Sequence, residues 1–143
     1  MTKKREVKTV LIIEDEIDIQ TFACRVLELE GYHVLKADDG EKGMEIIREN
    51  PVDLVLLNLR LPGRDGWSII NEIRHDAKLS KIPLAVITAI ADTRHRRRTL
   101  NMGVNKYLIK PLSAHSLAKT ITSILHKGGR RRDTIRENAG AED

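Results

Sequence analysis

The sequence has one cysteine, Cys24, and aromatic residues make up only 3% of it. A single cysteine cannot form an internal disulfide, and no Cys/His spacing typical of a zinc site is present. With so few aromatic residues, a core must be built from Ile, Leu, Val and Ala. No apolar run approaches the roughly 20 residues of a membrane span, and the start, MTKKREVKTV, has no signal-peptide apolar segment. We therefore expect a cytoplasmic protein.

The composition is that of an ordinary soluble domain. The chain has 143 residues, of which 41% are apolar and 32% charged, so one domain with a real core is expected. The net charge of +4 is unevenly placed, because basic residues gather at 3–8, 94–98 and 130–132. These clusters either attract an anionic partner such as nucleic acid or are merely solvated surface.

Short apolar runs alternate along the chain with longer segments of helical period. Strands are expected at 7–13, 33–36, 53–57, 84–87 and 106–109, and helices at 17–30, 40–49, 66–75, 92–102 and 113–126. This alternation predicts an α/β fold, a doubly wound five-stranded parallel sheet with helices on both faces. We expect a basic N-terminal extension at 1–6, one domain at 7–127 and a charged tail or linker at 128–143.

Polar residues follow four of the expected strands. The first strand leads into Glu14-Asp15-Glu16, and later strands lead into Asn58, Thr88 and Lys110-Pro111. Alone, an acidic pair is more often a helix cap and Thr88 a turn residue. Together they converge, because binding sites of open parallel sheets lie beyond the carboxyl ends of the strands. Carboxylate and amide oxygens suit Mg²⁺, and a lysine and a threonine can bind phosphoryl oxygens.

With these residues in view, positions 7–127 resemble the receiver domain of two-component response regulators. The resemblance implies a flavodoxin-like three-layer sandwich with sheet order 2-1-3-4-5. It also implies a Mg²⁺ site at Glu14, Asp15, Asn58 and Arg60. Further matches are the phosphoryl-binding and switch residues, which are Thr88, the small Ala89, Tyr107, Lys110 and Pro111, and the Leu-Pro-Gly-x-Asp-Gly turn at 61–66.

One position departs from the family pattern. Receivers accept phosphate on an aspartate at the end of the third strand, where this chain has Asn58. A carboxamide is a poor nucleophile, so phosphorylation should be blocked and Mg²⁺ binding should be weak. Asp53 cannot substitute, since it lies about 16 Å away at the other end of the strand. Asn58 is either an engineered block or the mark of a natural degenerate receiver.

The resemblance implies a protein-binding module rather than an enzyme. Expected partners are a histidine kinase or phosphotransfer protein, a downstream signalling protein, and a second copy bound through the fourth helix, fifth strand and fifth helix. The output face would include Arg94, Arg97, Arg98, Lys106 and Tyr107.

Two other functions are weaker interpretations of the same sequence. A nucleic-acid-binding module would use the basic fourth helix and the tails, but no recognition motif accompanies them. A phosphotransferase would need a nucleophile, and no Walker loop or dinucleotide glycine motif is present. The five histidines are expected to lie away from the strand ends and to offer no base. An ordinary receiver should rest mainly inactive, with Lys110 held by Asp15 or Asn58 and Tyr107 largely outward or mixed. A natural degenerate receiver would instead be locked active by its sequence alone.

Overall fold

A computed structural model describes residues 6–126. Strands and helices alternate without exception along this part of the chain. The strands are β1 (Thr9–Ile13), β2 (His33–Ala37), β3 (Leu54–Asn58), β4 (Leu84–Thr88) and β5 (Lys106–Ile109). The helices are α1 (Ile17–Leu29), α2 (Gly40–Glu49), α3 (Gly66–Arg74), α4 (Thr93–Asn101) and α5 (Ala114–Leu125). The expected extension and tail fall almost entirely outside the described residues.

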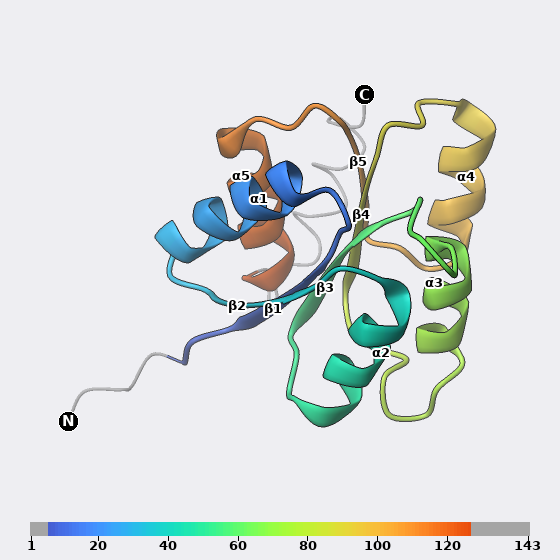
Figure 1. Cartoon of the computed structure of the whole chain (residues 1–143), viewed down its shortest axis with the longest axis horizontal. Helices are drawn as coiled ribbons and strands as arrows, with labels where there is room; N and C mark the ends of the chain where they lie inside the picture. Colours follow the sequence, from blue (N-terminus) through green and yellow to red (C-terminus); the bar gives the residue numbers. More distant parts are fainter. Residues whose placement is uncertain (1–5, 127–143) are drawn as a thin grey trace.

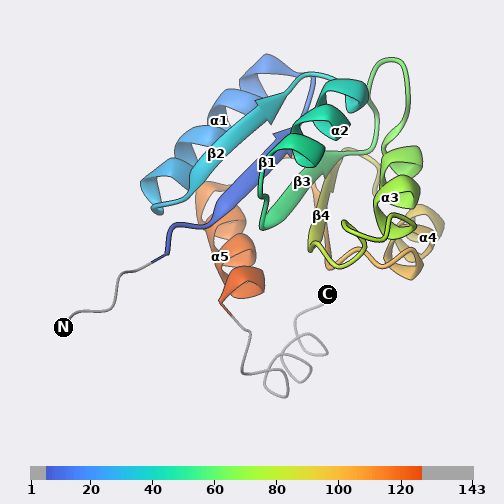
Figure 2. The ribbon, with the colours of Figure 1, turned by 90° about the horizontal axis from the view of Figure 1, so that it is seen from below.

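All five strands pair in parallel in the order β2-β1-β3-β4-β5, which confirms the predicted fold (Figures 1 and 2). Two strands, β3 and β4, are buried along their whole length, as expected for strands covered on both faces. Within residues 6–126, no helix is long and apolar enough to cross a membrane.

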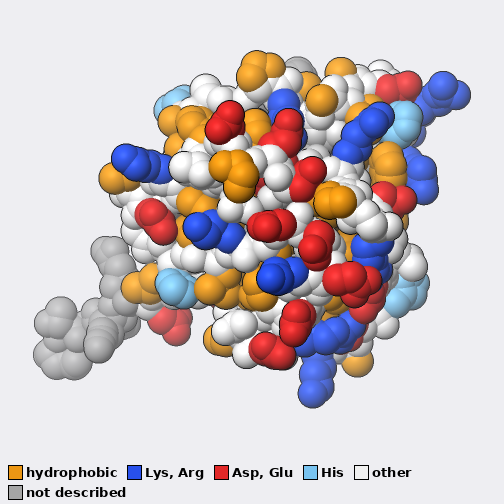
Figure 3. All heavy atoms as spheres, viewed as in Figure 1, with side chains coloured by type: hydrophobic (Ala, Val, Ile, Leu, Met, Phe, Trp, Pro, Cys, Tyr) orange, Lys and Arg blue, Asp and Glu red, His pale blue; other side chains and the backbone are white. Residues whose placement is uncertain are grey.

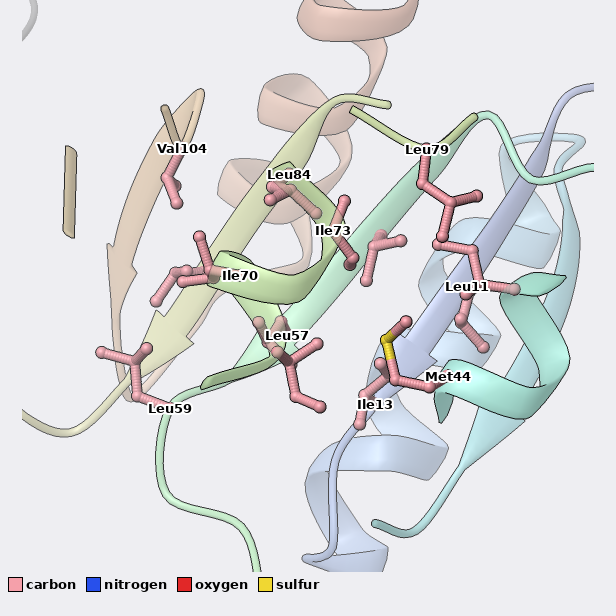
Figure 4. Packing of buried hydrophobic residues seen from close by; sticks show 14 of the residues in the cluster. Leu11, Ile13, Met44, Leu57, Leu59, Ile70, Ile73, Leu79, Leu84 and Val104 are labelled. Atoms are coloured by element: carbon pink, nitrogen blue, oxygen red, sulfur yellow. The ribbon is translucent and has the colours of Figure 1, made fainter. Parts of the chain in front are cut away.

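Two apolar layers cover the sheet, one on each face. Because successive side chains of a strand point to opposite faces, Leu11 and Ile13 pack with α2 and α3, whereas Val10 and Ile12 pack with α1 and α5. Figure 4 shows the first layer, in which Met44 of α2 and Ile70 and Ile73 of α3 lie over the strands. As the composition predicted, aliphatic side chains dominate both layers.

Most element boundaries agree with the prediction to within two residues. Four helix starts have a side-chain cap, among them Ser113, whose hydroxyl accepts the Ser116 N–H at 3.0 Å. Asn58 and Thr88 are the last residues of β3 and β4, not the first residues after them. The hydrogen-bonded backbone of the sheet therefore fixes the positions from which these two side chains extend.

Candidate functional site

The polar residues at the strand ends come together at one edge of the sheet. Glu14, Asn58 and Thr88 are all buried, and Lys110 of the β5–α5 connection reaches the same group. The carboxyl ends of parallel strands place them there, as the sequence predicted. Asp53, at the opposite end of β3, accepts the Thr9 N–H at 2.8 Å and has a structural role.

The amide of Asn58 is the centre of this group. Its Nδ2 donates to Glu14 Oε2 at 3.0 Å, to Asp15 Oδ1 at 3.3 Å and to the Arg60 carbonyl at 3.0 Å. Its Oδ1 accepts the Arg60 N–H at 3.3 Å. Three oxygen acceptors around one atom require an N–H donor, so the network itself assigns this orientation of the amide.

This arrangement does not fit a cation among the residues predicted to bind Mg²⁺. Magnesium needs oxygen ligands, yet the atom that Asn58 presents to Glu14, Asp15 and Arg60 is a nitrogen. In this arrangement the Asn58 oxygen accepts the Arg60 N–H, so its role as a neutral oxygen ligand stays a prediction. Among the described residues, no three Asp, Glu, His or Cys side chains group closely enough to hold a metal.

Glu14 is a fully buried carboxylate with incomplete hydrogen bonding. Oε2 accepts the Glu16 N–H at 3.0 Å, whereas Oε1 has no hydrogen bond and faces the Lys110 ammonium at 3.4 Å. Burial raises the pKa of Glu14, and the Glu16 N–H and Lys110 oppose that rise. Lys110 also pairs with Glu16 at 2.7 Å. The expectation that Lys110 contacts Asp15 or Asn58 is wrong, because these two glutamates hold it instead.

The β4–α4 connection links the two predicted switch residues. The Ile90 N–H donates to Thr88 Oγ1 at 3.1 Å, and the Ile90 carbonyl accepts the Tyr107 hydroxyl at 2.9 Å. Tyr107 is only 7% exposed, and this burial raises the pKa of its hydroxyl. The expectation that Tyr107 of an ordinary resting receiver points outward or is mixed does not hold in this structure, while its place on the output face stays a prediction. Ala89 lies exposed between these groups, and the Lys110-Pro111 bond is cis.

The turn after β3 depends on a close approach by glycine. The Gly66 N–H donates to the Leu59 carbonyl at 2.7 Å, and a Cβ at Gly66 would lie 2.7 Å from Leu59 Cα. It would also lie 2.8 Å from the Asn58 carbonyl oxygen. Only glycine lets α3 begin this close to the end of β3.

A cleft of about 490 Å³ opens beside the amide network. Its lining includes Asp15, Arg60, Trp67, Ile90 and His95. His95, which lies on α4, is the one histidine among the described residues that line this cleft. One feature of the sequence could have indicated that these residues lie together. His95 and Thr99 are four residues apart, so they share the helical face that contacts Trp67.

The predicted output residues occupy different environments. Arg94, Arg97 and Arg98 are exposed on α4, and Lys106 is half-buried at the start of β5. Arg98 lies over the Trp67 ring, with 4.7 Å between its guanidinium carbon and the ring centroid.

Comparisons with known proteins agree with this architecture. A family model described as the response regulator receiver domain matches residues 10–122. The chain is 34% identical over 118 residues to a probable transcriptional regulator ycf27 of Porphyridium aerugineum, covering 82% of this chain and 48% of that protein. It is 30% identical over 122 residues to the phosphate regulon transcriptional regulatory protein PhoB of Pseudomonas aeruginosa, covering 85% and 53%. The chain thus spans about half the length of these curated relatives.

Solved structures show the same fold. A putative response regulator from Chloroflexus aurantiacus matches with a TM-score of 0.80 at 28% identity, covering 84% of this chain and 98% of that chain. The chemotaxis response regulator CheY4 of Vibrio cholerae matches with a TM-score of 0.79 at 22% identity, covering 84% and 100%. At that identity the second likeness shows the fold alone.

Proposed function

The chain belongs to the receiver-domain family of two-component response regulators, and from this premise we propose that it signals without phosphate on residue 58. Response regulator receiver domains interact with histidine kinases and with downstream effectors. In this chain, the output would be a protein contact that does not wait for phosphoryl transfer. The observation that carries the proposal is the Asn58 amide, which donates hydrogen bonds to both carboxylates of the site.

The chemistry of the amide supports the first half of the proposal. Formation of an acyl phosphate requires a carboxylate oxygen to attack phosphorus while the donor's phosphorus bond breaks. The amide nitrogen has its lone pair delocalised into the carbonyl, and its hydrogens already point at Glu14 and Asp15. Asn58 therefore offers no nucleophile at the position that the family phosphorylates.

Receiver domains generally bind Mg²⁺ at their phosphorylation site, and weak Mg²⁺ binding is part of the proposal. A cation among Glu14, Asp15 and Arg60 would require the Asn58 amide to turn over and give up its present hydrogen bonds. Position 58 would also contribute no negative charge. Both effects lower the affinity of this site relative to one with an aspartate.

The buried Tyr107 supports the second half of the proposal. A ligand shifts an equilibrium only by its differential affinity for the two states. Tyr107 is buried and its hydroxyl donates to the Ile90 carbonyl, and Asn58 cannot carry the phosphoryl group that would otherwise bias that position. A receiver that rests in this state presents one form of its α4–β5–α5 face at all times. On this proposal the chain is a cytoplasmic binding module, not an enzyme, and its partner is a downstream signalling protein.

Mass spectrometry after incubation with acetyl phosphate and Mg²⁺ tests the missing nucleophile. We expect no added phosphoryl group on the unaltered chain and one on Asn58→Asp. As a matched control, Asn58→Asp combined with Asp15→Ala should lose most of that phosphorylation, because the metal carboxylate is gone. Phosphate on Asp15 or Glu14 of the unaltered chain would contradict the proposal.

Fluorotyrosine NMR tests the resting state, because the chain has only two tyrosines and Tyr32→Phe assigns the signals. We expect the Tyr107 signal to keep its buried position in the unaltered chain with or without acetyl phosphate. In Asn58→Asp, phosphorylation should move the Tyr107 signal toward that position. A solvent-exposed Tyr107 signal in the unaltered chain would show that the receiver rests in the other state.

A further inference from the structure

The α4–β5–α5 face carries charge of one sign. Its basic residues are Arg94, Arg96, Arg97 and Arg98 of α4, Lys106 of β5 and Lys119 of α5. None of these three elements contains an aspartate or a glutamate, and the nearest carboxylate along the chain is Asp92, which caps α4. Figure 3 shows Lys and Arg side chains gathered over α4, at the upper right.

The folding of α4 does not account for these arginines. Arg94 and Arg97 lie in the first half of the helix, where the positive end of the helix dipole disfavours cations. Arg94 and Arg97, and Arg94 and Arg98, are spaced so that like charges lie side by side. The Arg94 side chain is 90% exposed, and its closest carboxylate oxygen, on Asp92, is 4.0 Å away.

Contacts with α3 hold the helix in place instead. Trp67 Nε1 donates to Thr99 Oγ1 at 2.9 Å, and the Trp67 and His95 ring centroids are 5.5 Å apart. Thr99 is the one residue of α4 that is fully buried. These contacts use the inner side of α4 and leave Arg94 and Arg97 at the surface.

We propose that Arg94, Arg97 and Arg98 of α4 bind an acidic segment of a partner protein. The inference rests on the proposed function, since it takes α4–β5–α5 as the output face and adds the chemistry of the partner. A symmetric dimer through this face is disfavoured, because an isologous interface brings the same patch of both copies together. Here that patch would set arginine and lysine against arginine and lysine. The partner must bring carboxylates that this face lacks.

Charge elsewhere on the surface favours a short acidic segment over nucleic acid. The exposed side of α2 carries Glu41, Glu45 and Glu49, and Figure 3 shows Asp and Glu side chains beside and below the basic group. A duplex long enough to follow α4 would bring its phosphates near these carboxylates. Single strands would need stacking aromatics, whereas Tyr107 is buried and Trp67 is covered by Arg98. An acidic protein segment that contacts only α4 avoids the repulsion from nearby carboxylates and needs no stacking aromatic residues.

Fluorescence anisotropy with a designed probe tests this inference. The probe is a labelled helical peptide with glutamates spaced by three and four along one face, to match Arg94, Arg97 and Arg98. A scrambled peptide of the same composition separates spacing from charge, and a 20-base-pair duplex tests nucleic acid. The variant is Arg94→Glu with Arg97→Glu, and its matched control is Arg25→Glu with Lys81→Glu, two exposed cations on other surfaces.

We expect the patterned peptide to bind the full chain without phosphodonor, and the α4 variant to weaken binding at least tenfold. The control variant should change affinity less than twofold, and circular dichroism should show that both remain folded. Equal loss in both variants, equal binding of the scrambled peptide, or tighter binding of the duplex would each overturn the inference. Because no phosphodonor is present, these outcomes are separate from the phosphorylation test of the proposed function.

Discussion

The α2–α3 flank and the α4 face both carry many charged side chains. The two regions differ in how these charges are paired within the chain. On the flank, Arg64 pairs with Glu72 at 2.8 Å and with Glu41 at 3.6 Å, and Arg48 pairs with Glu72 and Asp76. On α4, the exposed Arg94 lies 4.0 Å from Asp92, its cap residue, and Arg97 is exposed one turn further on. Ion pairs within the chain hold the flank together, whereas Arg94 and Arg97 present their charge at the surface, where a partner can reach it.

Arg74 breaks this comparison most strongly, because backbone carbonyls accept four hydrogen bonds from its guanidinium. Its guanidinium donates to the carbonyls of Ser80, Ile82 and Gly103 at 2.6–3.2 Å and ties the ends of two loops to α3. Burial lowers its pKa. We expect Arg74→Met, which keeps the apolar stem, to lower the free energy of unfolding by about 2–3 kcal/mol. Urea denaturation measures this loss, and the exposed Arg25→Met should show almost none.

Trp67 joins the two regions, since it lies on α3 and contacts α4. Trp67→Phe keeps a ring under Arg98 but removes the indole N–H that bonds to Thr99. We expect a loss of about 1 kcal/mol in unfolding free energy. Hydrogen exchange should show faster opening of α4 than of α2. Equal acceleration in both helices would mean that Trp67 acts on the whole domain and not on α4.

Replacing one arginine on the flank and one on α4 tests whether the two regions use their charges differently. The expected changes in stability are smaller than those above. Arg64→Met removes two ion pairs and the hydrogen bonds to Ser68, so we expect a loss of about 1 kcal/mol. Arg97→Met removes one of several like charges on α4 and should change stability by less than about 0.5 kcal/mol. Thermal unfolding at low and high salt measures both. Equal losses would show that α4 also uses its charges for stability.

The smallest effect is a pH dependence that arises from Glu72 on the flank. Hydrogen bonds from Arg64 and Arg48 lower the pKa of Glu72. A carboxylate with a lowered folded-state pKa contributes stability above its unfolded pKa of about 4.5, and loses it as the pH falls through the folded value. Acid titration of Glu72→Gln should therefore show a shallower decline of stability below that pH. An identical decline in the unaltered chain would mean that other carboxylates dominate.

The sequence predicted the placement of the site because placement follows from topology. Apolar runs identified the strands, and parallel pairing then brought Glu14, Asn58, Thr88 and Lys110 to one edge. The direction of each side chain could not be predicted in this way. Whether Asn58 presents oxygen or nitrogen depends on which acceptors surround it, and the glutamate that Lys110 reaches depends on rotamers.

The contacts of α4 were harder still to predict. Helical spacing placed three arginines on one face, but it did not show that Trp67 packs against His95 and Arg98. That contact joins α3 and α4, which are separated by a strand, so it depends on how the two helices lie on the sheet. The buried Tyr107 has the same origin, since its hydroxyl partner is a backbone carbonyl that no residue type announces.

The two hydrogen bonds of Ile90 have a consequence for evolution. Thr88 and Tyr107 are joined through the amide and the carbonyl of this one residue, and its side chain takes no part in either bond. Substitutions at position 90 can therefore accumulate while the link persists. A search for co-varying positions would therefore miss Ile90. The link between Thr88 and Tyr107 runs through the backbone atoms of Ile90, which do not depend on the amino acid at that position.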